Sequence, residues 1–309
     1  MIKNNPKETY SIIGCGFIGK ALLKNLLNKD IQINILDRNS CPEEFAGMIN
    51  WIQGDFSDKK KLEKALDGSA VAFHLISSTV PGDQDSNMAQ ELNENVVSTI
   101  NFINIAIQKK VKRVVFSSSA SVYGIQECLP INESALPNPI SSHGIIKLTI
   151  EKYLQLYEFL YGIEIKILRI ANPYGPGQDI YGRQGFIAMA IGNILAEKPI
   201  LIRGGGQIIR DYIYIDDVVE LMANSAKFNN LPGIINIGSG IGLSLNDIIN
   251  QFRFFLGDSF RIKHEDYRKI DIPVSILNRQ ISENFLHFSP LIDIKLGVNN
   301  FLSSHGLIK

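Results

Sequence analysis

The sequence has little of what several classes of protein need. It contains only three cysteines, Cys15, Cys41 and Cys128, which are far apart, odd in number and outside any metal-ligand spacing. This pattern excludes a disulfide-stabilised scaffold and a cysteine-based metal site. We therefore expect reduced thiols, no bound metal and a cytoplasmic protein.

The chain of 309 residues also lacks an excess of either charge, because 31 Lys and Arg side chains balance 31 Asp and Glu. A neutral protein has no electrostatic basis for binding nucleic acid or an anionic membrane surface. No apolar run reaches the roughly 18 residues that span a bilayer, and the first ten residues, MIKNNPKETY, have no apolar signal core. We expect neither nucleic acid nor membrane as a partner, so any phosphate recognition has to come from a few placed groups.

What the first half of the sequence does have is an alternation of apolar strand-like runs and amphipathic helix-like segments. The expected strands are residues 10–13, 31–36, 49–55, 70–76 and 113–117, and the expected helices include 59–66 and 87–108. This alternation predicts an α/β fold, a doubly wound parallel sheet of the Rossmann type.

From residue 172 onward the pattern is less regular and richer in Gly and Pro, as in NPYGPGQ and RGGGQ, the second of which we interpret as a turn between strands. We therefore expect a dinucleotide-binding domain over 1–171. A smaller, mainly C-terminal α/β substrate lobe over 172–309 would be interleaved with the sheet domain.

A glycine-rich motif, G-x-G-x-x-G, lies between the first strand and the first helix. Its glycines are Gly14, Gly16 and Gly19, with Phe17 and Ile18 between the last two. Such glycines allow a tight turn, a close approach of backbone to a pyrophosphate and tight packing of helix on strand, while the helix N-terminus offers free N–H groups to the phosphates. The motif predicts that these residues bind a dinucleotide.

Acidic residues follow the second and third strands. Asp37 can accept both ribose hydroxyls of NAD and would repel the 2′-phosphate of NADP, which favours NAD(H). Arg38 is either a solvated loop side chain or a partner for that phosphate, so NADP(H) stays open. Asp55, beside Phe56 in GDFSD, is expected either to meet the adenine amine or to lie at the N-terminus of the next helix. His74 alternates with apolar residues, and we expect a hydrogen-bonded core histidine there.

Motifs along nearly the whole chain are similar to those of one family. They are, in order, GCGFIG, GDFSD, FHLI, NENVVST, VVFSSSASVYG, KLTIEKYL, ILRIANPYGPGQ, RDYIYIDDV and INIGSG. On these motifs the chain resembles the extended short-chain dehydrogenases/reductases, specifically their nucleotide-sugar epimerase/dehydratase group. The family often has a glycine where this chain has Ile13, so the chain departs from the pattern at the start of the turn and needs φ < 0 there.

The resemblance implies that a hydride moves between nicotinamide C4 and a sugar carbon while a proton moves on the attached oxygen. In the family a Ser holds that oxygen, a Tyr exchanges the proton, and a Lys one turn later binds the nicotinamide ribose and lowers the Tyr pKa. Ser119 matches the Ser and Lys147 matches the Lys, but the position of the Tyr holds His143. The spacing of four residues places His143 and Lys147 on one face of a helix.

The imidazole of His143 has an ordinary pKa of about 6.5 and can exchange protons at neutral pH. Burial and the cation of Lys147 both disfavour the imidazolium and lower that pKa. Three interpretations stay open. His143 acts as the acid and base in place of Tyr, or it only orients substrate or water while Ser119 or solvent delivers the proton, or the site is inactive and only binds ligand.

The residue after the serine separates the reactions of the group. Dehydratases usually carry an acidic residue there, and this chain has Ala120, so we do not expect 4,6-dehydration. A 4-epimerase removes and restores a proton in each turnover, whereas a reductase only needs net delivery of one. Loss of the Tyr should therefore lower the rate of an epimerase more than that of a reductase.

We therefore expect an NAD(P)-dependent reductase of the 4-keto group of a nucleotide-activated hexose. By resemblance the substrate is of the dTDP-6-deoxy type, as in dTDP-4-dehydro-6-deoxyglucose, in O-antigen or other surface-polysaccharide synthesis. The alternatives are a nucleotide-sugar 4-epimerase with bound NAD and a non-catalytic protein that binds NAD or a nucleotide sugar.

The resemblance also implies contacts to the nucleotide sugar. Asn172 lies where relatives contact the diphosphate, and Arg210 and Arg268 lie where the family places phosphate-binding arginines, whose planar guanidinium groups can bind two oxygens at once. For Arg210 the alternative is an ion pair with Asp211 or Asp216, and for Arg268 a solvated loop. Tyr123 is expected either to touch the hexose or to pack in the core.

Relatives commonly pair through two helices, one of which carries the Tyr–Lys motif. In this chain the apolar faces of 87–108 and 148–161 fit a homodimer, and they fit packing on the sheet equally well.

Overall fold

The core of the molecule is one seven-stranded parallel sheet. The computed structural model describes residues 8–79, 87–268, 270–286 and 292–308. The strands of the sheet are in the spatial order β10-β6-β5-β4-β1-β2-β3, and every neighbouring pair is parallel. Their bounds are β1 (Glu8–Ile13), β2 (Ile31–Asp37), β3 (Asn50–Gln53), β4 (Ser69–His74), β5 (Arg113–Ser119), β6 (Glu164–Ile170) and β10 (Ile234–Ile237). The order reverses between β1 and β4, where doubly wound sheets open a ligand-binding crevice.

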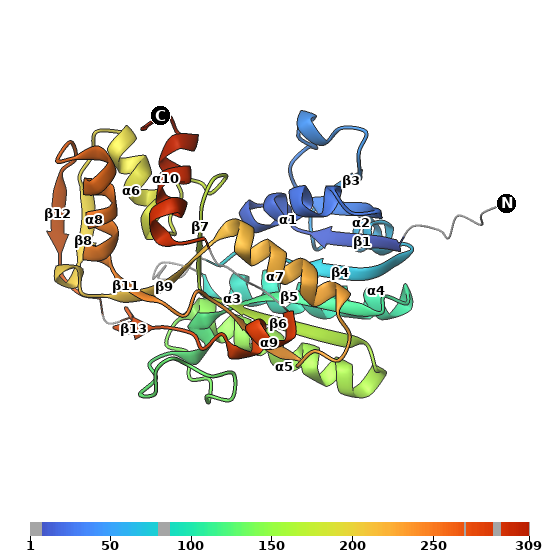
Figure 1. The fold of residues 1–309 in the computed structure, drawn as a ribbon. Coiled ribbons are helices and arrows are strands. Elements are labelled where there is room, and N and C mark those ends of the chain that lie inside the picture. The colour runs from blue at the N-terminus through green and yellow to red at the C-terminus, as the bar shows by residue number, and fades with distance from the viewer. Residues whose placement is uncertain (1–7, 80–86, 269, 287–291, 309) are drawn as a thin grey trace.

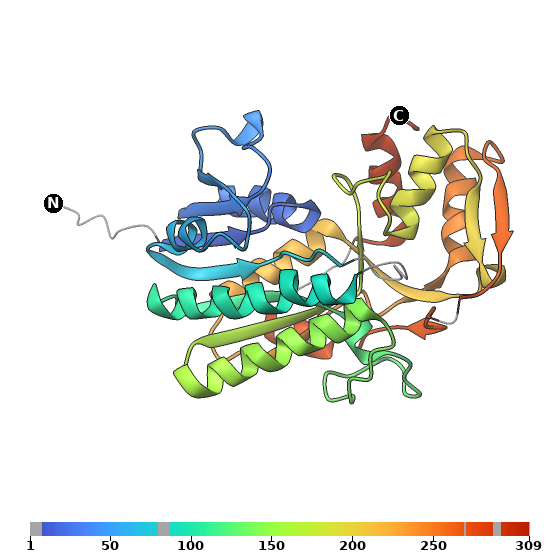
Figure 2. The ribbon, with the colours of Figure 1, turned by 180° about the vertical axis from the view of Figure 1, so that it is seen from behind.

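Helices cover both faces of the sheet, which explains why its strands are apolar without alternation. On one face α1 (Phe17–Leu27) and α7 (Ile215–Lys227) pack on each other, and α9 (Gln280–Leu286) lies beside β10 (Figure 1). On the other face α2 (Lys59–Leu66), α4 (Ser98–Gln108) and α5 (Ser142–Tyr161) form a second layer (Figure 2). The doubly wound α/β fold predicted from the sequence is confirmed.

The helix predicted over 87–108 has three parts. A single turn, α3 (Met88–Glu91), continues into the π-helical η2 (Leu92–Val97) and then into α4. In η2 the buried side chain of Asn95 accepts a hydrogen bond from the backbone N–H of Ser78 over 3.0 Å and donates to the Ser78 hydroxyl over 2.7 Å. π-Helical turns of this kind are common at functional sites, and this one ties the helix to the loop that follows β4.

The remaining elements form a smaller lobe, drawn on the left of Figure 1. In it β9 pairs with β7, β11 and β13, and β8 pairs with β12. The bounds are β7 (Asn172–Tyr174), β8 (Ile200–Arg203), β9 (Ile209–Tyr214), β11 (Gly242–Ser244), β12 (Ile262–Glu265), β13 (Val274–Ser275), α6 (Phe186–Leu195), α8 (Leu245–Leu256) and α10 (Ile294–Ser304). The chain enters this lobe after β6, returns to the large sheet through α7 and β10, and then enters the lobe again.

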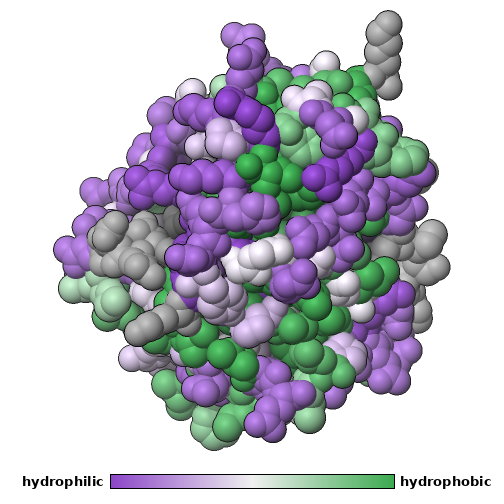
Figure 3. Space-filling view, turned by 90° about the vertical axis from the view of Figure 1, so that its left-hand side faces the viewer, coloured by the Kyte–Doolittle hydropathy of each residue, from purple (hydrophilic) through white to green (hydrophobic). Residues whose placement is uncertain are grey.

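The described part of the chain also has three short 3-10 turns, namely η1 (Glu43–Phe45), η3 (Ala120–Tyr123) and η4 (Gly204–Gly206). The turn predicted for RGGGQ is η4, whose three glycines all have positive φ. The outer face of the smaller lobe mixes hydrophilic and hydrophobic residues (Figure 3). Within the described ranges, no helix is long and apolar enough to cross a membrane, and no three His, Cys, Asp or Glu side chains are grouped as a metal site.

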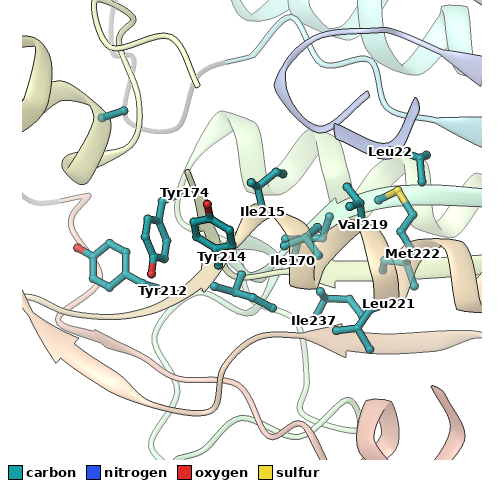
Figure 4. Packing of buried hydrophobic residues seen from close by; sticks show 14 of the residues in the cluster. Leu22, Ile170, Tyr174, Tyr212, Tyr214, Ile215, Val219, Leu221, Met222 and Ile237 are labelled. Atoms are coloured by element: carbon teal, nitrogen blue, oxygen red, sulfur yellow. The ribbon is translucent and has the colours of Figure 1, made fainter. Parts of the chain in front are cut away.

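The two lobes share one hydrophobic core. Where they meet, the ring of Tyr174 lies 5.6 Å from that of Tyr214 and 6.4 Å from that of Tyr212, measured between ring centroids (Figure 4). These tyrosines belong to the same buried cluster as Leu22 of α1 and Met222 of α7. Because each fully buried large apolar side chain contributes about 1.5–3 kcal/mol to stability, this continuous core holds the facing walls of the crevice in a defined position.

Candidate active site

A cavity of about 770 Å³ lies between the sheet and the smaller lobe. This volume is within the range of about 300–1,000 Å³ typical of small-molecule sites. The cavity brings together most of the site residues predicted from the sequence. Those that line it are Gly14, Gly16, Phe17, Ile18, Gly19, Ser119, His143, Lys147, Asn172, Arg210 and Arg268.

The glycine-rich turn is built for close approach of a ligand. Gly14 has a φ of +98°, a conformation that favours glycine. A Cβ on Gly19 would lie 2.3 Å from the carbonyl oxygen of Gly14, so α1 begins directly against the turn. A Cβ on Gly16 would meet nothing within 4 Å, and the N-cap of α1, Gly16, provides no side-chain hydrogen bond to the first N–H groups of the helix. The open space at Gly16 and the uncapped helix N-terminus fit a dinucleotide pyrophosphate.

Asp37 ends β2 and braces this turn. Its carboxylate accepts hydrogen bonds from the backbone N–H of Cys15 over 2.7 Å and from that of Asn39 over 2.9 Å. Asp37 does not itself line the cavity, and neither does the exposed Arg38 that follows it. The carboxylate therefore lies beside the turn, at the edge where the ribose of a bound dinucleotide is expected.

Asp55 and Phe56 also lie outside the cavity lining. Asp55 accepts hydrogen bonds from the hydroxyl and the backbone N–H of Ser57, which lower the pKa of its carboxyl. The N-cap of α2 is Asp58, not Asp55. Phe56 is buried, with its ring centroid 5.0 Å from that of His74, so its ring packs in the core. A contact of Phe56 with the cofactor stays a prediction.

His74 is the core histidine that the sequence predicts. Its Nε2 lies 2.7 Å from the hydroxyl oxygen of Thr99, and the rings of Phe102 and Phe116 pack on it. Burial, followed by the cation of Lys147, lowers the pKa of His74 to about 3. The residue therefore stays neutral and structural.

Tyr123 is completely buried and does not line the cavity. Its hydroxyl donates a hydrogen bond to Asn236 over 2.7 Å, and the guanidinium of Arg169 lies 4.6 Å from its ring centroid. Of the two expectations for Tyr123, contact with the hexose or packing in the core, the structure supports packing.

Ser119 lies at the carboxyl end of β5 and lines the cavity. Its hydroxyl oxygen accepts hydrogen bonds from the backbone N–H of Ser121 over 3.2 Å and from the Ser121 hydroxyl over 3.0 Å. A hydroxyl has two acceptor positions and one proton. With both acceptor positions occupied, the proton of Ser119 is left to donate to a ligand in the cavity.

Helix α5 carries the other two predicted catalytic residues. The hydroxyl of Ser141 caps its N-terminus by accepting from the N–H of Gly144 over 3.2 Å. A Cβ on Gly144 would lie 2.6 Å from the carbonyl oxygen of Ser121, so only glycine lets α5 begin this close to η3. The close approach brings His143 and Lys147 to the same cavity as Ser119.

Lys147 lies in the wall of the cavity and is only 4% exposed. Its Nζ donates to the carbonyl oxygen of Ser117 over 2.8 Å and lies 4.8 Å from the ring centroid of Phe116. Burial lowers the pKa of Lys147 to about 8, and the nearby carboxylate of Glu151 opposes that shift. The side chain is therefore mainly a cation at neutral pH and begins to lose its proton just above it.

His143 is 8% exposed, and its Nδ1 lies 2.7 Å from the hydroxyl oxygen of Thr79. Burial and, after it, the cation of Lys147 lower the pKa of His143 to about 3. This is the direction the sequence predicts, and it makes the imidazole neutral at physiological pH. Among the residues that the structure describes, none forms a hydrogen bond with Nε2, so this nitrogen is left for a ligand.

Two parts of the site were missed by reasoning from sequence. One is Thr79, which holds His143; the run of hydroxyl residues after β4 at the switch point of the sheet was the available signal. The other is Glu151, which lies eight residues after His143 and four after Lys147 on the same face of α5. Glu151 is buried and paired with Arg169.

Four arginines line the half of the cavity formed by the smaller lobe, namely Arg183, Arg203, Arg210 and Arg268. Arg210 donates to the carbonyl oxygens of Ile209 and Ile272, over 2.9 and 2.5 Å. Arg268 forms a two-point ion pair with Asp271. In a protein with no net charge, this concentration of guanidinium groups suits an anionic, multiply charged ligand.

The ion pair considered for Arg210 with Asp211 does not form. The carboxylate of Asp211 instead accepts hydrogen bonds from the backbone N–H groups of Ser239, Gly240 and Leu277. The side chain of Asn172 donates to the carbonyl oxygen of Asp211 over 3.0 Å. These bonds fix the strands that carry Asn172 and Arg210.

Residues 11–238 match the model of the NAD dependent epimerase/dehydratase family. The chain is 30% identical over 294 residues to a putative UDP-glucose 4-epimerase of Methanocaldococcus jannaschii, covering 94% of this chain and 95% of that protein. It is 29% identical over 302 residues to a dTDP-4-dehydro-6-deoxyglucose reductase of Escherichia coli, again covering 94% of this chain and 95% of that protein. The crystal structure of the UDP-glucose 4-epimerase of Thermotoga maritima with UDP-glucose has a TM-score of 0.89 and 26% identity, covering 97% of this chain and 99% of that one.

Proposed function

Because the chain belongs to the NAD-dependent epimerase/dehydratase family, we propose that it is a nucleotide-sugar 4-epimerase that works with bound NAD. The observation that carries this proposal is the shared cavity, in which Ser119, His143 and Lys147 face the same space as the open glycine-rich turn. The likeness to two 4-epimerases puts epimerisation ahead of the reduction that the sequence first favoured.

The cofactor that the family implies is NAD, whose nicotinamide would supply the acceptor and donor of a hydride. The residues of the chain would do the rest. The uncapped start of α1 holds the pyrophosphate, Lys147 holds the nicotinamide ribose, and Ser119 donates a hydrogen bond to the oxygen on C4. Nε2 of His143 is the base that takes the proton of that oxygen, because a neutral imidazole is ready to accept.

The substrate class follows from the smaller lobe. The arginines that line it would bind the two phosphates of a nucleoside diphosphate sugar, with Arg210 and Arg268 as the residues that the sequence also selects. Asn172 lines the same cavity as these arginines and the proposed catalytic residues. We place a uridine or thymidine diphosphate hexose in this cavity.

A second candidate function is reduction of a 4-keto nucleotide sugar. His143 favours it, because a reductase needs only net delivery of a proton and loses less when Tyr is absent. The likeness to the E. coli reductase supports the same interpretation.

One experiment separates these functions. Purified protein is incubated with UDP-glucose without added cofactor, and in parallel with dTDP-4-dehydro-6-deoxyglucose and NADH or NADPH, and the sugars formed are identified. Formation of UDP-galactose in the first reaction supports the epimerase. Oxidation of the nicotinamide only in the second supports the reductase, and ligand binding with no turnover in either supports a binding protein.

The matched control lies on the same helix. Lys147→Met should abolish the reaction that wild type shows, whereas Lys152→Met, which removes an exposed lysine of α5, should leave it unchanged.

We also infer a homodimer that forms through α5 and its neighbour η2. Large apolar side chains are exposed on both, among them Phe159 of α5, which is 85% exposed, and Val97 of η2. Figure 2 shows α4 and α5 side by side on the face that would be covered. Light scattering should give twice the chain mass for wild type and the chain mass for Phe159→Glu, and a monomeric wild type would reject the dimer.

A further inference from the structure

The environment of His143 differs from that of a surface histidine in how poorly it stabilises a protonated ring. Its ring is buried and beside a cation, so an imidazolium formed there is unstable. A base at this position can take the substrate proton easily, but it needs a way to release a proton and recover it. The described structure offers such a way at the other ring nitrogen, Nδ1.

Two hydroxyl groups connect Nδ1 to solvent. Nδ1 lies 2.7 Å from Oγ1 of Thr79, and this oxygen lies 3.0 Å from Oγ of Ser77. Thr79 is 3% exposed, whereas Ser77 is exposed, and both line the cavity. The three groups thus form an unbroken chain of hydrogen bonds from a buried ring nitrogen to the surface.

Because each of these groups can both donate and accept a hydrogen bond, a proton can pass along the chain in either direction. Each hydroxyl can donate one hydrogen bond and accept two, so the chain can point outward, from Nδ1–H to Thr79 to Ser77 to water, or inward in the reverse order. Among the residues that the structure describes, His143 is the one acidic or basic side chain that forms a hydrogen bond with Thr79 or Ser77. The cation of Lys147, on the same helix, acts on the ring, and the carboxylate of Glu91 in α3 accepts a hydrogen bond from Ser142, the residue before His143.

We propose that Ser77 and Thr79 form a proton relay through which the buried ring of His143 exchanges its Nδ1 proton with solvent. This inference rests on the proposed function of His143 as the base. When Nε2 takes the proton of the substrate hydroxyl, an N–H bond forms at Nε2 and the Nδ1–H bond breaks. Nδ1 passes its proton to Thr79, Thr79 passes its own to Ser77, and Ser77 passes its own to water, so the ring stays neutral and changes only its tautomer.

The reverse passage restores the ring. Nε2 gives its proton to the substrate oxygen, while water, Ser77 and Thr79 each pass one proton inward and Nδ1 is protonated again. One proton is released and one is recovered over a full epimerisation, and one is taken up in a reduction. The relay therefore serves either of the two reactions, and it explains how a His can occupy the position of the Tyr.

Two pairs of variants test the relay. Thr79→Val removes the hydroxyl and keeps the shape, while Thr79→Ser keeps the hydroxyl. Ser77→Val and Ser77→Thr make the same comparison at the outer position, where the apolar side chain also prevents water from replacing the hydroxyl. Thr149→Val, on the solvent side of α5, is the control for loss of a threonine hydroxyl elsewhere.

The first readout needs no substrate. In protein labelled with nitrogen-15 at histidine, the Nδ1–H signal of His143 is assigned by its loss in His143→Gln, and its exchange with water is measured. The two valine variants at positions 77 and 79 should slow this exchange, and the two hydroxyl-retaining variants and Thr149→Val should not. Unchanged exchange in Thr79→Val would overturn the relay, as would equal slowing in Thr79→Ser.

The second readout is turnover. Proton transfer by a placed group contributes about 10²–10⁴ in rate, so Thr79→Val should lose about tenfold or more in kcat while Thr79→Ser stays near wild type. If wild type turns over no nucleotide sugar but the exchange pattern holds, the proposed function fails and the relay stands. If wild type turns over a sugar and exchange does not depend on Thr79, the function stands and the relay fails.

Discussion

Glu151 and Arg169 form a two-point ion pair in the interior of the protein. Nη2 of Arg169 lies 2.7 Å from one carboxylate oxygen of Glu151 and Nε lies 3.1 Å from the other, and both residues are only 1% exposed. The same carboxylate accepts a hydrogen bond from Ser118, the neighbour of Ser119. The ion pair and this hydrogen bond therefore join α5, β5 and β6 next to the side chains that we propose to be catalytic.

Breaking this ion pair should destabilise the protein strongly. Glu151→Gln keeps the shape but leaves the Arg169 cation buried without a counter-charge, and such losses cost about 3–5 kcal/mol in the free energy of unfolding. Urea unfolding monitored by circular dichroism measures the loss. The matched control is Lys109→Ala, which breaks an exposed, solvent-screened ion pair with Asp67 and should leave the free energy of unfolding close to that of wild type. Equal small losses in both variants would contradict the buried role.

The pH dependence of activity should be set by Lys147 rather than by His143. The pKa of His143 is lowered to about 3, so the imidazole is already neutral throughout the ordinary assay range. The pKa of Lys147 is lowered to about 8, so its cation is lost as the pH rises through that value. We expect kcat/KM to be level near pH 6 and 7 and to fall above about pH 8.

The variant Lys147→Arg tests whether Lys147 causes the fall in kcat/KM above about pH 8, the falling limb of the pH profile. A guanidinium keeps its charge throughout this range. The variant should remove the limb even if the maximal rate is lower. A limb near pH 6.5 in wild type would instead show that His143 titrates as an ordinary histidine.

Stability should decrease as the pH falls below about 6.5. His74 and His143 bind a proton near pH 6.5 in the unfolded chain but only near pH 3 in the folded protein, because burial lowers both pKa values to about 3. The unfolded state therefore binds more protons between these limits, and each histidine contributes up to about 1.4 kcal/mol per pH unit.

Urea unfolding at several pH values checks this slope. His143→Gln should make it shallower, whereas replacement of the exposed His264 by Gln should leave it unchanged. An unchanged slope in His143→Gln would mean that this histidine is protonated in the folded protein.

Two glycines of the turn should respond differently to alanine. Gly19→Ala places a Cβ 2.3 Å from the carbonyl oxygen of Gly14 and should lower thermal stability, because the turn or α1 has to shift. Gly16→Ala meets no protein atom within 4 Å and should leave the melting temperature near that of wild type while weakening NAD binding. Differential scanning fluorimetry and calorimetric titration with NAD separate the two effects. Normal NAD affinity in Gly16→Ala would place the pyrophosphate elsewhere.

Much of the fold could be predicted because its signals are local. The strands of the first half are continuous apolar runs, and Gly14, Gly16 and Gly19 follow the first of them at a spacing with a physical meaning. Ser119, His143 and Lys147 were selected by resemblance to the family, and all three line one cavity, while their catalytic roles stay a prediction.

The rest could not be predicted because it depends on contacts between distant segments. Thr79 and His143 form a hydrogen bond although they are 64 residues apart in the sequence, and no local sequence pattern predicts such a contact. Phe56 and Tyr123 are aromatic residues inside informative motifs, yet each packs into the core, since a motif fixes the backbone path without fixing where every side chain points. The π-helical η2 also has no periodic signature, because it forms where Asn95 reaches out to Ser78.

The path of the chain between the lobes limits how the protein can be divided. In the sequence, α7 and β10 follow the first segment of the smaller lobe. A gene fragment ending at residue 171 would therefore encode a sheet that lacks its edge strand β10 and also lacks α7, the helix that packs on α1. Such a fragment would expose both the unpaired edge of β6 and an apolar face, which favours self-association. The cofactor-binding half is thus not a transplantable module, and chimaeras that exchange substrate lobes with relatives would need at least two junctions.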